Sequence, residues 1–149
     1  MVPAKFDYDT MADRFPYRYL FHLQYLGFRY HGWQKQPDVL TVEGMIEKSF
    51  AFMFGHRDFK VLGGARTDAM VSANHSVFML FCRELSDPEK LVLELNDHLP
   101  GDIRVLNAES KSCDFNIINS PRIKEYIYLF SCGKKGHPFS ASLMHAVRG

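Results

Sequence analysis

Cysteine is scarce in this chain and is not arranged as a framework. Three cysteines occur in 149 residues, Cys82, Cys113 and Cys132, and none of them forms a C-x-x-C pair or a His/Cys cluster with metal-ligand spacing. An odd number of widely separated thiols fits a reducing compartment. We therefore expect a cytoplasmic protein without a metal site.

Long apolar runs and an excess of one charge are also missing. No run reaches the roughly 18 apolar residues that a membrane helix needs, and no signal peptide is visible, so we expect no membrane association. The formal net charge is +1, and bulk charge therefore does not indicate a nucleic-acid partner. Any RNA contact would need local basic groups, whose commoner role is a solvated surface. The candidates are Arg57, Lys60 and Arg66, and the group Arg122, Lys124, Lys134 and Lys135.

The chain does have the apolar content of a folded domain. Apolar side chains make up 46% of the residues, and 13 Phe and 7 Tyr are among them. This composition and length predict one compact domain. We place it at residues 17–132, after a flexible N-terminal segment at 1–16 and before a connecting segment at 133–149.

Apolar periodicity predicts five strands and two helices. The strands are expected at residues 17–25, 59–62, 76–82, 103–106 and 126–130. The first helix follows the capping residue Thr41 and ends at Gly55, and the second follows Ser86 or Asp87. The first four strands and both helices have the order β-α-β-β-α-β. This order predicts an α+β, ferredoxin-like fold, in which an antiparallel sheet carries both helices on one face, with an extra C-terminal strand.

The segment between the second and third strands holds Arg66 and Asp68, two residues apart. Taken alone, such a pair more often forms a loop salt bridge, or an Asx turn in which the aspartate bonds local amides. In a strand, residues two apart would share a face.

Five segments of the chain, in the same order, resemble motifs of TruA-type tRNA pseudouridine synthases. Residues 63–73 resemble the signature G-x-G-R-T-D-x-G-V-H-A, and the other segments follow. They are residues 32–37 (G-W-Q-x-Q-P), 41–43 (T-V-Q/E), 95–103 (L-N-x-x-L-P-x-D-I) and 124–128 (R/K-x-Y-x-Y). The resemblance covers most of the chain, from Tyr25 to Tyr128.

The resemblance implies an isomerase that converts uridine to pseudouridine in tRNA, in the anticodon stem-loop. Asp68 would be the catalytic nucleophile, Tyr126 would pack against the flipped base, and Arg66 would favour the ionised carboxylate. No redox step occurs, so no cofactor is implied. The resemblance also implies that this chain is the N-terminal catalytic half of a homodimeric enzyme, and that the isolated 149 residues are inactive.

The chain departs from the family pattern at several positions. Ala65, Met70 and Ser72 stand where the family has Gly, Gly and His, and Ile118 stands where it has a basic residue that Arg122 could replace. These departures leave open a divergent, catalytically weak tRNA-binding relative. A ferredoxin-like interaction domain with no RNA role is a third interpretation. Trp33 could either close the core or contact RNA.

Overall fold

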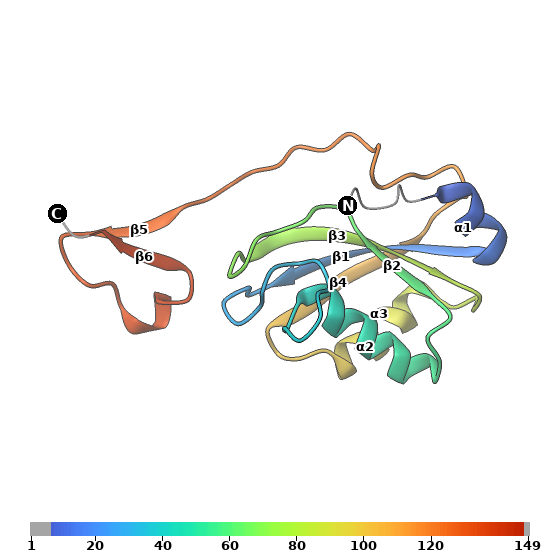
Figure 1. The fold of residues 1–149 in the computed structure, drawn as a ribbon, viewed down its shortest axis with the longest axis horizontal. Coiled ribbons are helices and arrows are strands. Elements are labelled where there is room, and N and C mark those ends of the chain that lie inside the picture. Colours follow the sequence, from blue (N-terminus) through green and yellow to red (C-terminus); the bar gives the residue numbers. More distant parts are fainter. Residues whose placement is uncertain (1–6, 148–149) are drawn as a thin grey trace.

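A four-stranded antiparallel sheet with two helices on one face forms the body of the protein. The computed structural model describes residues 7–147, without the side chain of Ala12. The elements of this body are β1 (Tyr17–Tyr25), α2 (Val42–Phe54), β2 (Lys60–Gly63), β3 (Ala73–Cys82), α3 (Pro88–His98) and β4 (Ile103–Ser110). The strand order is β2-β3-β1-β4, and each strand is antiparallel to its neighbour. Figure 1 shows α2 and α3 on the same side of the sheet, so the ferredoxin-like α+β prediction is confirmed.

Helix α2 begins and ends at the residues that the sequence indicates, and α3 begins after Asp87, one of its two expected caps. The Thr41 side chain accepts a hydrogen bond from the Gly44 amide at 3.2 Å, and Gly55 ends α2 in the left-handed conformation, with φ 72°. Asp87 caps α3 by accepting from the Glu89 amide at 3.1 Å. These local caps fix where the chain enters and leaves each helix.

The main core lies between the sheet and the helices. Phe21 and Phe78 stack at its centre, with ring centroids 4.8 Å apart, and Phe50 of α2 packs on both. Trp33 closes one end of this core and is only 1% exposed. Trp33 is therefore a core residue, and its burial argues against a direct RNA contact.

The second face of the sheet is covered at one end only. Helix α1 (Tyr8–Arg14) lies within the segment for which we expected flexibility, of which residues 1–6 fall outside the described part. Near α1, Phe15, Met79 and Ile117 belong to a second apolar cluster on this face. The uncovered end is polar, and there His22 and His75 form a 2.8 Å hydrogen bond.

The C-terminal strand differs from its prediction. We expected it at 126–130, but β5 spans Leu129–Cys132 and pairs in parallel with β6 (Met144–Val147). Residues 121–128, which we call the arm, lead away from the body to this small sheet (Figure 1). Residues 126–128, which carry the alternating aromatic side chains, precede the strand, and only residues 129–130 of the predicted range lie in it. Alternation also does not specify the partner strand.

Candidate active site

The signature loop, residues 64–72, joins β2 to β3 at one end of the sheet. Arg66 and Asp68 lie in this loop and not in a strand, so the expectation that they share a strand face does not apply. Within residues 7–147 the two side chains form no ion pair with each other. Burial raises the pKa of the Glu43 carboxyl, and the charge of Arg66 partly offsets that rise. Arg66 therefore lies close enough to α2 to act on Glu43.

Hydrogen bonds from buried residues hold the backbone of the signature loop on both sides of Asp68. The Thr67 carbonyl accepts from the Trp33 amide at 3.1 Å, and the Thr67 hydroxyl is 2.9 Å from the Tyr25 hydroxyl. On the other side, the Met70 amide donates to the Tyr30 carbonyl at 3.0 Å. Tyr25, Tyr30 and Trp33 are all at most 5% exposed. The loop is thus fixed to the core.

Three glycines allow this close packing. Gly32 has φ 86°, and a Cβ atom there would lie 2.5 Å from the Thr67 carbonyl oxygen. A Cβ atom on Gly63 would lie 2.2 Å from Trp33 Nε1, and one on Gly27 would lie 2.0 Å from the Val71 carbonyl oxygen. Only glycine fits at such distances. The segments 32–37 and 63–73 are therefore parts of one packed unit.

The segment 95–103 supports that unit from the opposite side. Asp102 accepts a hydrogen bond from the Tyr30 hydroxyl at 2.6 Å and a second from Arg29 Nη2 at 3.1 Å. Burial alone would raise the pKa of Asp102, but these hydrogen bonds outweigh burial and lower it. Asp102 thus anchors Tyr30, whose carbonyl in turn binds the Met70 amide.

The Asp68 side chain is not bonded to any of these anchors. It is exposed, and within residues 7–147 it makes no hydrogen bond or ion pair. Among the described residues, Asp68 therefore forms neither the loop salt bridge nor the Asx turn that is the commoner role of such a pair. A carboxylate left unbonded on a fixed backbone is preorganised for a ligand.

Tyr126 is not in contact with Asp68 in this structure. It lies in the arm and is 69% exposed. No hydrogen bond joins it to Arg66 or Asp68 within the described residues. The base of the arm, however, reaches the signature loop, because Arg122 Nη1 lies 3.1 Å from where a Cβ atom on Gly64 would be. The structure thus brings together the loop and the start of the arm, but not the three predicted site residues.

Two of the family departures have clear structural consequences. Met70 adopts a left-handed conformation, with φ 66°, at a position where glycine would be unstrained. The Ser72 hydroxyl accepts a hydrogen bond from the Gly27 amide at 2.8 Å. Ser72 therefore stabilises the packed unit, which was not apparent from the sequence. Ile118 is 48% exposed, and nothing in the structure explains Ala65.

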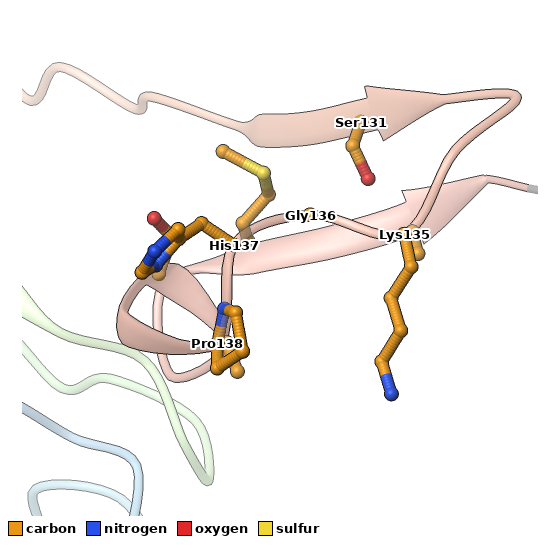
Figure 2. A pocket seen from close by; sticks show the side chains of 9 residues that line it. Ser131, Lys135, Gly136, His137 and Pro138 are labelled. Atoms are coloured by element: carbon orange, nitrogen blue, oxygen red, sulfur yellow. The ribbon is translucent and has the colours of Figure 1, made fainter.

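Two of the cavities among residues 7–147 involve the segments described above. One, of about 430 Å³, adjoins the signature loop and is lined by Ser72, Asn74 and Arg104 among others. Its volume suits a base-sized ligand. The other, of about 260 Å³, lies between the β5–β6 sheet and the connecting residues 135–141, where Figure 2 shows Lys135 extending its amino group away from the strands. Ser72 is the signature-loop residue that lines the first cavity, and Asp68 lines neither of the two.

Within residues 7–147, no group of three His, Cys, Asp or Glu side chains is placed to hold a metal ion. None of the described helices has the length and apolar character needed to cross a membrane.

Known proteins share these packed segments. A family model described as tRNA pseudouridine synthase matches residues 23–118, which is well over half of the chain. The chain belongs to this family.

Curated relatives agree with the family model. The chain is 35% identical to a tRNA pseudouridine synthase A of Caldicellulosiruptor bescii over 119 residues, which cover 80% of this chain and 48% of the relative. It is 34% identical to that of Aquifex aeolicus over 121 residues (81% and 50%), and 41% identical to that of Exiguobacterium sibiricum over 107 residues (71% and 42%). The chain thus spans about half the length of these synthases.

Proposed function

We propose that the protein isomerises uridine to pseudouridine in tRNA, in the anticodon stem-loop, with Asp68 as the nucleophile. One observation carries this proposal. Asp68 presents an unbonded, exposed carboxylate from a loop whose backbone is fixed to buried Tyr30 and Trp33, inside the region that matches the family. Fixed backbone and free side chain are what a reactive group requires.

The chemistry uses groups that this loop offers. The reaction breaks a C–N glycosidic bond and forms a C–C bond within the same nucleotide, so electrons balance without an oxidant or cofactor. A carboxylate such as Asp68 can divide the reaction into two easier steps through a covalent intermediate. The uridine must first leave its stack, which costs a few kcal/mol. Stacking on Tyr126 would offset part of that cost, and Arg66 would favour RNA near the loop.

We expect a complete site to need a covering surface that these 149 residues do not provide. The chain spans about half the length of its relatives, and the arm exposes Ile123, Ile127 and Tyr128 by 73% or more. Apolar side chains on a two-stranded sheet and its lead-in need a covering surface. We therefore expect the isolated chain to be inactive, and the complete enzyme to act as a homodimer on tRNA in the cytoplasm.

The test uses the protein expressed from its complete gene, with intact Asp68 and with Asp68→Asn, on unmodified tRNA. Pseudouridine is measured by mass spectrometry, and tRNA binding by filter retention. The proposal expects pseudouridine from the first protein only, with similar binding by both. Equal product from both proteins would remove Asp68 from the mechanism. Binding by both proteins without any product would favour the catalytically weak tRNA-binding relative. The lack of an ion pair between Arg66 and Asp68 within residues 7–147 is the reason to test that alternative.

A further inference from the structure

Arg122 is an arginine without an acidic partner. The exposed arginines Arg14 and Arg83 both pair with Asp58, at 2.7 and 2.9 Å. Arg122 forms no ion pair within residues 7–147, and its one hydrogen bond is a 3.3 Å contact from Nη2 to the Ile118 carbonyl. A guanidinium has five donors in a planar fork, so most of the donors of Arg122 are free.

The position of Arg122 is nevertheless fixed. It follows a turn in which the Asn116 side chain accepts from the amides of Ile118 and Asn119 at 2.9 and 3.2 Å. Ile117, in the same turn, is 2% exposed and its amide donates a hydrogen bond to the Tyr8 hydroxyl. Arg122 is thus held at the base of the arm, just before Ile123, which is 99% exposed.

This fixed position lies against the signature loop. Gly64 is buried, and its missing side chain leaves room for Arg122, because a Cβ atom there would be 3.1 Å from Nη1. Gly64 is separated from Asp68 by only three residues. Arg122 therefore places an unpaired positive charge beside the loop that carries the proposed nucleophile.

We propose that Arg122 binds a phosphate of the RNA backbone next to the nucleotide that is presented to Asp68. This inference rests on the proposed function. A guanidinium fork matches phosphate oxygens in a bidentate manner. Because the net charge of these 149 residues is only +1, they add little general attraction to RNA, and a local unpaired cation such as Arg122 is suited to a phosphate contact. Arg122 is then a binding residue that fixes the register of the RNA on the loop.

The test measures tRNA affinity as a function of salt in the complete protein carrying Asp68→Asn, so that no turnover disturbs binding. Into this protein we introduce Arg122→Gln, Arg122→Lys or Lys48→Gln. Lys48 is exposed on α2, on the opposite face of the sheet, and its substitution removes the same unit of charge. Because Arg122 is exposed, its substitution should leave the fold intact. Circular dichroism of each variant checks that it does.

Arg122→Gln is expected to weaken tRNA binding about five- to tenfold, and to reduce the slope of log K against log salt by about 0.7–1. Arg122→Lys should keep most of the slope, and Lys48→Gln should change neither quantity. If Arg122→Gln has the same affinity and slope as Lys48→Gln, the inference is overturned. A carboxylate elsewhere in the complete protein that pairs with Arg122 would overturn it as well.

The inference and the proposed function fail in distinguishable ways. If intact Asp68 yields no pseudouridine but Arg122→Gln still lowers the salt slope, the phosphate contact stands without the chemistry. If the enzyme is active and the slope is unchanged by Arg122→Gln, the phosphate contact alone is wrong. With intact Asp68, the substitution should raise KM and leave kcat within about twofold.

Discussion

Replacing Gly32 by alanine tests whether close packing of the loop positions Asp68. Gly32 has φ 86°, and the new Cβ atom would lie 2.5 Å from the Thr67 carbonyl oxygen. That oxygen already accepts the Trp33 amide at 3.1 Å. An ordinary contact begins near 3.4 Å, so the backbone at Thr67 must move by roughly 0.5–1 Å, because the contacting atom is main chain and cannot rotate away.

The expected cost has two parts. A left-handed alanine costs about 1–2 kcal/mol relative to glycine, and weakening the bond between Trp33 and Thr67 costs about 0.5–1.5 kcal/mol. We therefore expect Gly32→Ala to reduce the free energy of unfolding by about 1.5–3.5 kcal/mol. A displacement of about 1 Å in the residue next to Asp68 can cost up to about a hundredfold in rate, and we expect kcat to fall by at least about tenfold.

Gly55→Ala is the matched control. Gly55 also has positive φ, 72°, but a Cβ atom added to it, at the C-terminal cap of α2, would meet no other atom within 4 Å. Gly55→Ala should reduce the free energy of unfolding only by the conformational part, about 1–2 kcal/mol, and should keep full activity. Urea unfolding gives the two free energies, and single-turnover assays give the two rates. If Gly32→Ala is no more destabilising than Gly55→Ala and is fully active, the close approach to Thr67 does not position the nucleophile.

Three further substitutions test individual contacts. Met70→Gly should raise the free energy of unfolding by about 1 kcal/mol in urea, because it removes a left-handed methionine. Ser72→Ala should lower it by about 1–2 kcal/mol, because the Gly27 amide loses its acceptor. Asp102 has a lowered pKa in the folded state, so its contribution to stability is present at neutral pH and is lost as the pH falls below about 4. Asp102→Asn should flatten that acid limb, and an unchanged pH dependence would exclude Asp102 as its source.

The parts of the fold that the sequence predicts are those set by neighbouring residues, such as helix caps and strand alternation. The Thr41 cap and Gly55 set the limits of α2, and the alternation of Tyr17–Tyr25 sets those of β1, because each signal depends on neighbouring residues only. Strands β3 and β4 extend beyond their predicted limits, at residues 73–75 and 107–110. Those ends are mostly polar, so they carry no apolar pattern that would predict a strand. Backbone pairing with β1 extends the two strands there.

The candidate site likewise has one part that the sequence predicts and one part that it does not. The resemblance identified Asp68, but the contacts that fix its loop join residues far apart in sequence, such as Tyr25 with Thr67 and Tyr30 with Asp102. No spacing rule predicts such pairs. Arg66 and Asp68 form no ion pair within residues 7–147, and their segment is a loop, where side chains two residues apart need not share a side.

Single-turnover kinetics of pseudouridine formation show whether Asp68 carries the chemistry. The complete protein is mixed in excess with unmodified tRNA, so that all the tRNA is bound, and pseudouridine is followed with time. Asp97→Asn, which changes an exposed aspartate on α3, is the control. We predict that Asp68→Asn lowers the rate by at least about a thousandfold, while Asp97→Asn leaves it unchanged. A rate for Asp68→Asn equal to that of Asp97→Asn would contradict the account.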